Sequence, residues 1–245
     1  HAPITMDSSS SFGNYGVSIK NLLEFKHDAF VDGVSGQPTM TTNSTSNNDV
    51  LFKNGPIVNV DILIGPGGDI DKVVRFANPW NGQHNGTIGN LDAEVELPSS
   101  IAEPSLGASI GDVTYSSGTT VINSDIHCDT LTIDGTAIIQ IDGDVTILVE
   151  GNVLVTDDAK IQLLSGATLD FYAKGQTWFA GNSEINDNTA DPARFRLYHI
   201  AEHTVEKRLQ FQDSCTAYVQ MHGPTSYLPT CRHNAEVYGL SLIHI

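Results

Sequence analysis

The chain has 245 residues, of which 40% are hydrophobic, and 12 Lys and Arg residues stand against 29 Asp and Glu residues, giving a net charge of −17. This length can bury a substantial core, and the hydrophobic content excludes a disordered tail. A surface this acidic repels nucleic acid and anionic lipid, so we expect neither as a partner.

The first half of the chain gives only weak structural signals. Residues 1–16 are rich in Ser, Gly and Asn and are predicted to be a flexible lead-in. Residues 17–117 are predicted to be an irregular β-rich part and connector that flanks or caps the second half. Strand-like runs at 57–64 and 72–76 lie on either side of the turn at 65–68. That turn is not a phosphate-binding loop, because no GK[ST] sequence comes after it.

Short β-branched runs begin near residue 118 and recur at intervals of about 22 to 26 residues. A shift of 22 residues places three runs on three later ones in the same order: Leu131–Gly135 on Val153–Asp157, Ile139–Ile141 on Ile161–Leu163, and Val145–Val149 on Ala167–Phe171. The next copy contains Trp178–Ala180, Glu184–Asn186 and Phe195–Tyr198, and a looser fourth copy contains Leu209–Phe211, Ala217–Val219 and Glu236–Gly239.

One such repeat cannot bury its apolar side chains alone, so each copy stacks on the next and equivalent strands pair in parallel. Ile139, Ile141, Ile161 and Leu163 then point inward, and the residues between them point outward. We therefore predict an all-β fold, a right-handed parallel β-helix with coils of about 22–26 residues over residues 118–240. An antiparallel sandwich is the alternative, but a sandwich does not require a constant repeat length.

Charge and cysteine distribution add two further observations. No Lys or Arg lies between Arg75 and Lys160, whereas thirteen acidic residues do. We interpret this stretch as a solvated face that opposes aggregation, with weak Ca²⁺ binding as the alternative. Cys128, Cys215 and Cys231 lack the spacing of a zinc site, and a Cys215–Cys231 bond between adjacent coils is the alternative to free thiols.

The two ends of the chain are also informative. The sequence begins with His1 instead of Met, so we expect the natural start to lie upstream. Residues 241–245 resemble translated adapter sequence and are predicted to be a non-native tail. No segment is long and apolar enough to span a membrane. We expect an extracellular or cell-surface location and no membrane insertion by this part of the protein.

Two pairs of acidic residues are the candidate metal ligands. Asp142, Asp144, Asp157 and Asp158 would serve as Ca²⁺ ligands, or as acid–base groups of a polysaccharide-active enzyme, if they shared one outward face. Turn formation is the simpler interpretation, because Asp142 and Asp144 flank Gly143. No cofactor is predicted apart from this candidate Ca²⁺.

Three aromatic residues are the candidate ligand-binding residues. Tyr172, Trp178 and Tyr198 would form an exposed stripe for sugar binding, and stacking along a coil face is the alternative. The segment His199–His203 (HIAEH) has the spacing of an inverted zinc-protease motif, which requires both histidines on one face of a helix. It comes directly after a predicted strand, so we interpret it as a surface loop and predict no catalytic residue.

Several segments carry a family likeness: residues 59–68 (NVDILIGPGG), 143–151 (GDVTILVEG), 159–172 (AKIQLLSGATLDFY), 184–186, 195–198 and 237–239. In them the chain resembles the β-helical domain of uncharacterised function found in type IV pilus-associated (PilX-like) bacterial surface proteins. The likeness covers roughly residues 20–240, but Met221–Thr225 replaces the family's usual Ala-Pro step. The resemblance implies a cell-surface or pilus-linked structural domain without established catalytic residues.

These observations leave three functional hypotheses. The first is a structural or adhesive module of a bacterial surface or pilus-associated protein, with other surface proteins, pilus proteins or glycans as partners. The second is a β-helical carbohydrate-active enzyme, either a polysaccharide lyase or a hydrolase. The third is a self-polymerising scaffold of the bactofilin kind, which requires uncapped ends.

Overall fold

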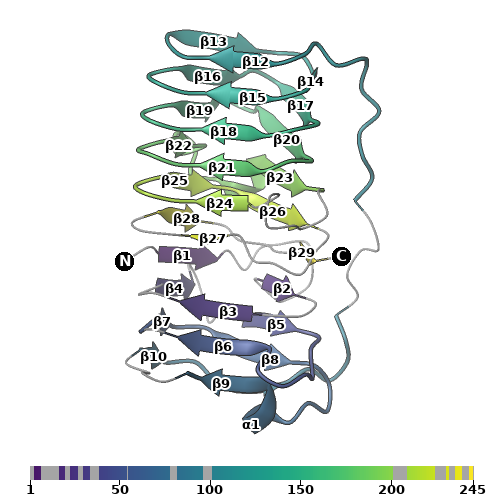
Figure 1. The fold of residues 1–245 in the computed structure, drawn as a ribbon, viewed down its shortest axis with the longest axis vertical. Helices are drawn as coiled ribbons and strands as arrows, with labels where there is room; N and C mark the ends of the chain where they lie inside the picture. Colours follow the sequence, from purple (N-terminus) through teal and green to yellow (C-terminus); the bar gives the residue numbers. More distant parts are fainter. Residues whose placement is uncertain are drawn as a thin grey trace.

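The computed structural model describes residues 3–6, 17–19, 23–26, 30–33, 39–53, 55–77, 82–95, 101–200, 209–223, 230–231, 235–238 and 243–244. The described part is almost entirely β-structure, and all of the strand pairings in it are parallel. The strands stack as coils of a β-solenoid with three faces (Figure 1). The prediction of an all-β parallel β-helix is therefore confirmed.

The C-terminal coils repeat one order of faces: a third face, then sheet A, then sheet B. The third-face strands form sheet D: β12 (Val113–Tyr115), β15 (Leu131–Ile133), β18 (Val153–Val155), β21 (Thr177–Phe179), β24 (Leu209–Phe211) and β27 (Thr230–Cys231). Sheet A receives β13 (Thr119–Ile122), β16 (Ile138–Ile141), β19 (Lys160–Leu163), β22 (Glu184–Ile185), β25 (Thr216–Tyr218) and β28 (Glu236–Tyr238). Sheet B receives β14 (Ile126–Cys128), β17 (Asp144–Val149), β20 (Thr168–Ala173), β23 (Phe195–His199), β26 (Gln220–Gly223) and β29 (Ile243–His244).

The N-terminal strands join the same stack. Sheet A continues through β1 (Pro3–Met6), β4 (Phe30–Gly33), β7 (Ile57–Val58) and β10 (Gln83–His84). Sheet B continues through β2 (Val17–Ile19), β5 (Thr39–Thr42), β8 (Asp61–Ile64) and β11 (Ile88–Asn90). On the third face, β3 (Leu23–Lys26), β6 (Val50–Lys53) and β9 (Val74–Phe76) form a separate sheet C. Sheets A and B thus contain ten strands each and run through both halves.

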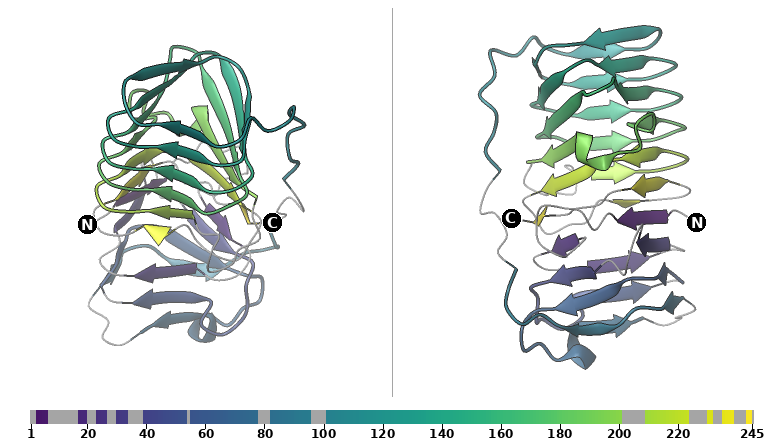
Figure 2. Two further views of the ribbon diagram at one scale, coloured as in Figure 1. Left: turned by 45° about the horizontal axis from the view of Figure 1, so that its top comes forward. Right: turned by 180° about the vertical axis from the view of Figure 1, so that it is seen from behind.

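The order of coils along the rod differs from their order along the chain. The last coil stacks on the first, because β28 pairs with β1 through Ile4 and Val237, and β29 pairs with β2 through Ser18 and Ile243. The chain therefore starts in the middle of the stack, winds to one end at β11, and starts again at the far end with β12 (Figure 1). The connection between them is residues 91–112, and its described part at 101–112 runs along the outside of the rod, as Figure 2 shows. We call the described residues of this connection, 91–95 and 101–112, the strap.

This arrangement makes the N-terminal part more regular than its sequence indicates. It occupies one end of the rod, and its strands are coils of the helix itself. Strand β1 lies inside the predicted flexible lead-in, and most of residues 1–16 lie outside the described residues. Strand β29 likewise lies inside the predicted non-native tail. In both cases parallel pairing across the middle of the stack orders a segment that has no strong local signal.

The core is a column of inward-facing aliphatic and aromatic side chains. Ile139 pairs with Ile161 and Ile141 with Leu163, and all four are at most 2% exposed, as predicted. One predicted register is wrong: Val145 pairs with Leu169 instead of Ala167. The corner before β20 is two residues longer than the corner before β17, and Gly166 adopts φ 76° there.

Three further expectations are corrected. The run at 72–76 is not a single strand, since α1 (Ile70–Val73) precedes β9 and its Val73 is fully buried. The looser fourth copy combines two coils, because β28 pairs with β25 one coil above it. Cys215 is a free buried thiol, so no Cys215–Cys231 bond forms.

Candidate functional site

Polar and aromatic side chains gather on the outer face of sheet B, which we call the B face. Strand register places Thr146, Asp170, Arg196 and Gln220 in one row across β17, β20, β23 and β26. The guanidinium of Arg196 forms a bidentate ion pair with Asp170: Nε lies 2.5 Å from Oδ1, and Nη2 donates to Oδ2 at 2.8 Å. All four residues are half-buried, so the pair is partly shielded from water.

The neighbouring row of the B face is aromatic. It contains Leu148, Tyr172, Tyr198 and His222 in consecutive coils. The rings of Tyr172 and Tyr198 stack with centroids 4.4 Å apart and planes at 13°, and those of Tyr198 and His222 stack at 4.7 Å and 16°. Because these side chains stand one coil apart, their ring faces contact each other.

Burial sets the ionisation of these groups. It raises the pKa of Asp170 above its ordinary value, although Arg196 acts in the opposite direction. Burial also raises the pKa of Tyr198 to about 12. It lowers the pKa of His222 to about 4, and the positive charge of Arg196 lowers the pKa of His222 further. Tyr198 therefore stays protonated and His222 stays neutral near pH 7, and neither has the pKa of an efficient general base at that pH.

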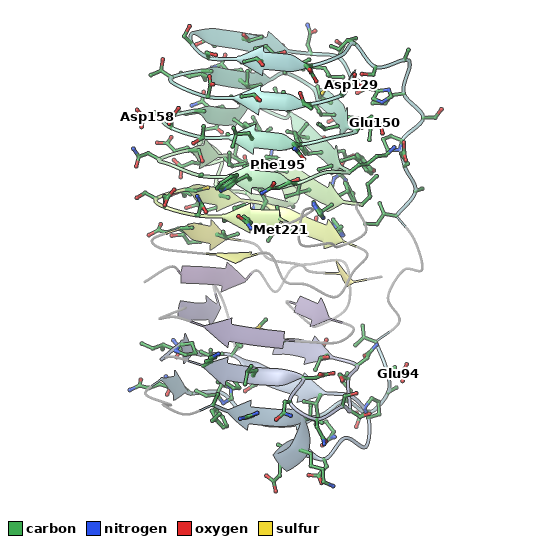
Figure 3. The ribbon with its side chains drawn as sticks, viewed as in Figure 1. Glu94, Asp129, Glu150, Asp158, Phe195 and Met221 are labelled. Carbon is green, nitrogen blue, oxygen red and sulfur yellow. The ribbon has the colours of Figure 1, made fainter. Side chains whose placement is uncertain are left out.

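The strap borders the B face where strands β14, β17 and β20 end. Lys174 Nζ lies 2.5 Å from Glu103 of the strap and 3.0 Å from Glu150, and Glu150 lies 2.9 Å from His127 Nε2. The other ring nitrogen of His127 is 2.5 Å from the Gly107 carbonyl. Both ring nitrogens thus face acceptors, which raises the pKa of His127, while Lys174 and His127 lower the pKa of Glu150. We call Glu103, His127, Glu150 and Lys174 the latch, of which Figure 3 labels Glu150.

A second segment, residues 186–194, lies where strands β20 and β23 begin. Arg194 donates to the carbonyls of Leu164 and Ala167 at 2.5 and 2.7 Å, at the corner between β19 and β20. Asn188 bonds both backbone groups of Leu163, at 2.8 and 3.1 Å. The 3₁₀ helix η1 (Pro192–Arg194) ends this segment directly before β23. The B face is therefore flanked on one side by the strap and on the other by this loop.

The structure brings together two of the three predicted ligand-binding aromatics. Tyr172 and Tyr198 are partners in the B-face stack, with their ring faces against each other instead of open to a sugar. Trp178 lies on the third face, in β21, between Leu154 and Gln210 of the adjoining coils. Its indole nitrogen is shielded from solvent, so the three side chains form no common stripe.

The four candidate metal ligands lie at two different corners. Asp142 and Asp144 flank Gly143, which adopts φ 90° between β16 and β17, and Asp144 accepts a hydrogen bond from Thr168 at 2.7 Å. Asp157 and Asp158 form the corner between β18 and β19, labelled by Asp158 in Figure 3. Within the described ranges, no three His, Cys, Asp or Glu side chains form a group suited to hold a metal ion.

Other sequence candidates have structural partners. His199 ends β23, is 8% exposed, and its Nε2 lies 3.0 Å from the Gly175 carbonyl. Residues 201–203 of the HIAEH segment lie outside the described residues. The Asp170–Arg196 pair and the latch were not predicted from the sequence. The 26-residue shift that aligns residues 169–172 with 195–198 also places Asp170 opposite Arg196, and so could have predicted the pair.

The fold and the B face define the chain as a parallel β-helix protein with an external strap. The chain belongs to the DUF7305 family, a domain of unknown function whose family model matches residues 82–221. The matched region starts at β10 and ends in β26, so it includes the strap and the B-face strands β14, β17, β20 and β23. Comparisons with curated proteins and with solved structures give no match. No helix in the described ranges is long and apolar enough to cross a membrane.

Proposed function

We propose that this chain is a structural or adhesive module of a bacterial cell-surface or pilus-associated protein, located outside the cell, and that it performs no catalysis. The observation that carries the proposal is the continuity of sheets A and B, each of which has ten strands crossing both halves. A stack joined by backbone hydrogen bonds at every coil is a stiff rod, and its faces offer long regular surfaces to surface proteins, pilus proteins or glycans.

The chemistry of the B face supports a structural role. The ring faces of Tyr172, Tyr198 and His222 are used in mutual stacking, which stabilises the coil-to-coil contact. Arg196 is neutralised by Asp170, and the shifted pKa values of Tyr198 and His222 are unfavourable for proton transfer near pH 7. These properties suit a face that keeps its shape.

The test is a screen of the purified full chain against a panel of neutral and acidic polysaccharides. Binding is measured by affinity electrophoresis, and turnover is measured by the release of reducing or unsaturated ends. We expect retention by a subset of glycans or by bacterial cells, without turnover. Polysaccharide cleavage that is lost in both Asp170→Asn and Arg196→Lys would refute the proposal, provided that both variants keep the wild-type melting temperature.

A carbohydrate-active enzyme is the second candidate, and one observation favours it. The B face brings together one charged residue from each of three consecutive coils: Asp144, Asp170 and Arg196. Enzymes that cleave polysaccharides can use an arginine beside carboxylates for acid–base catalysis. The raised pKa of Asp170 would suit a proton donor. The same screen separates this candidate from a structural module.

The self-polymerising scaffold has weaker support. A continuous polymer of β-helices needs two open ends, and α1 lies against β9 and β11 at one end of the rod (Figure 1). Val73 of α1 is fully buried there, so this end carries a packed cover.

A further inference from the structure

The two ends of the rod differ in how their apolar side chains are covered. Among the described residues, three large hydrophobic side chains are exposed, and all three lie at the ends: Phe76 at the α1 end, and Ile110 and Val121 at the β12–β13 end. Phe76 is 44% exposed but stacks on Phe52 at 4.7 Å. Ile110 and Val121 are 68% and 51% exposed. Among the side chains that the structure describes, the large exposed apolar ones therefore lie where coil stacking stops.

The β12–β13 end is open. Tyr115 and Ile126, which point inward from the first coil, remain half-buried, whereas Ile133 and Ile147, their counterparts one coil further in, are 2% and 3% exposed. A small apolar cavity begins at these side chains and extends down the core to Phe171. In Figure 1 β12 and β13 are the outermost strands, and no described element covers them.

The free edge of β13 is competent for pairing. Gly118 and Ile122 direct their carbonyls to β16, accepting from Ile138 and Asp142 at 2.8 and 2.9 Å. Backbone groups alternate in direction along a parallel strand, so the N–H and C=O groups of Thr119 and Val121 point away from β16. Natural edges are usually blunted by charge or proline, and the sequence of β13, Thr-Thr-Val-Ile, contains neither.

In the same coil, the free edge of β14 is already paired with the strap. The backbone N–H of Ile110 in the strap donates to the His127 carbonyl at 2.9 Å, and the backbone N–H of Asp129 donates to the Gly111 carbonyl at 2.9 Å. The strap therefore completes the edge of β14 by backbone pairing, and it does not reach β13. Pairing of an extended segment with an end strand is thus a mode of contact that this coil already uses.

The surroundings of the open edge are anionic. Asp112 and Asp125 are exposed in the first coil, and no Lys or Arg occurs between Arg75 and Lys160. A second copy of the chain, with its net charge of −17, would bring the same acidic end against this one. A segment with positive charge has no such repulsion to overcome, because this end of the rod carries acidic residues and no Lys or Arg.

We propose that the β13 edge binds an extended, cationic segment of a partner protein as an additional strand of sheet A. Backbone groups of Thr119 and Val121 would pair with the segment, and apolar residues of the segment would cover the core opening. Its Lys or Arg side chains would lie at the acidic end of the rod, near Asp125 at the corner directly after β13. This inference goes beyond the proposed function, because the edge is available whether the rod is structural or catalytic.

The test uses the full chain and a short fluorescein-labelled peptide in which valine alternates with lysine. Fluorescence anisotropy measures its affinity for the wild type, for Val121→Pro and for Val121→Thr. Proline removes a donor that β16 does not use, so the fold is retained, whereas threonine keeps the N–H group and the β-branched shape. We expect Val121→Pro to bind about tenfold more weakly, which is the effect of about 1.4 kcal/mol of lost binding energy, and Val121→Thr to bind like the wild type.

Hydrogen exchange gives an independent readout. The peptide should slow exchange of the Thr119 and Val121 amides, and a peptide with glutamate in place of lysine should not bind. Equal binding to wild type and Val121→Pro, or unchanged exchange at Thr119 and Val121, would overturn the proposal. Concentration-dependent dimerisation of the wild type that Val121→Pro abolishes would also overturn it, by assigning the edge to a second copy. Melting temperature and circular dichroism confirm the fold of each variant.

Discussion

The C-terminal coils and the N-terminal coils build the same solenoid from sequences with very different regularity. In the C-terminal half, β15 pairs with β18 and β18 with β21, and the inward positions are mostly aliphatic. In the N-terminal half the strands are separated by polar loops and by α1, yet they occupy the same sheets A and B. A coil can therefore join the stack when its strands pair with those of the neighbouring coil and its inward side chains fill the same core, even if its sequence shows no clear repeat.

The halves also differ in how they are held. Consecutive coils within each half are covalently continuous, whereas the two halves meet at β28–β1 and β29–β2 through strand pairing. The described residues of the strap are fixed in both of its parts, at 91–95 by Asn43 bonding Val95 at 2.8 and 2.9 Å and at 101–112 by the latch. Substitutions in each half, and in the strap, test whether the halves behave as one cooperative unit.

The largest effect is expected from the core of each half. Phe171→Ala in the C-terminal half and Phe52→Ala in the N-terminal half each remove a ring that is fully buried, and each should lower the free energy of unfolding by about 3–5 kcal/mol. If the halves unfold together, both variants shift one urea transition to a lower midpoint. Phe171→Leu, which keeps most of the volume, should cost clearly less. Two separate transitions, each sensitive to one variant, would show that the halves unfold independently.

The next effect comes from close approaches between coils. A Cβ on Gly86 would lie 2.0 Å from the Val60 carbonyl oxygen, and one on Gly175 would lie 2.2 Å from that of Gly151. Gly86→Ala and Gly175→Ala should therefore each destabilise by about 1–3 kcal/mol in thermal or urea unfolding, since backbone must move to admit the methyl group. Gly107→Ala is the control, because its Cβ would have nothing within 4 Å. A neutral Gly86→Ala would contradict the tight stacking of the last N-terminal coil.

A smaller effect is expected at the latch. Lys174→Met removes both ion pairs to Glu103 and Glu150, which are partly exposed, so it should cost about 1 kcal/mol or less. The more specific effect of Lys174→Met should be faster hydrogen exchange in residues 101–112, with little change in the core. High salt should partly reproduce this faster exchange in the wild type, because it screens the ion pairs. Lys72→Met breaks an exposed pair with Asp69 away from the strap and should leave strap exchange unchanged.

The smallest effect is a pH dependence of the same segment. The pKa of His127 is raised because the Gly107 carbonyl and the Glu150 carboxylate stabilise the protonated ring. Its contribution is therefore fully present below the unfolded pKa of about 6.5 and is lost as pH rises through the higher folded pKa. Strap protection, corrected for intrinsic exchange rates, should be greater at about pH 6 than at about pH 9. His127→Gln should remove this difference, and an unchanged difference would assign it to another group.

Much of the C-terminal half could be predicted because the relevant contacts are between neighbouring coils. The pairing of Ile139 with Ile161 follows from a constant shift, and the residue after each inward position points outward. The predicted register of Val145 was wrong, since it depends on the length of a corner, and β-strand patterns do not encode corner length. Tyr172, Trp178 and Tyr198 do not form one stripe, because Trp178 lies on the third face and the two tyrosines lie on the B face.

The amino-acid sequence was sufficient to establish that the chain winds into coils, because alternating inward residues with turns at a near-constant interval can bury their apolar surface only by stacking. Which coil lies on which became clear only from the folded molecule, as did the meeting of the first and last coils in the middle, the course of the strap along the rod, and the open β13 edge. The physical reason is that stacking within a repeat is local and periodic, whereas the join between β28 and β1 depends on complementary edges far apart in the chain.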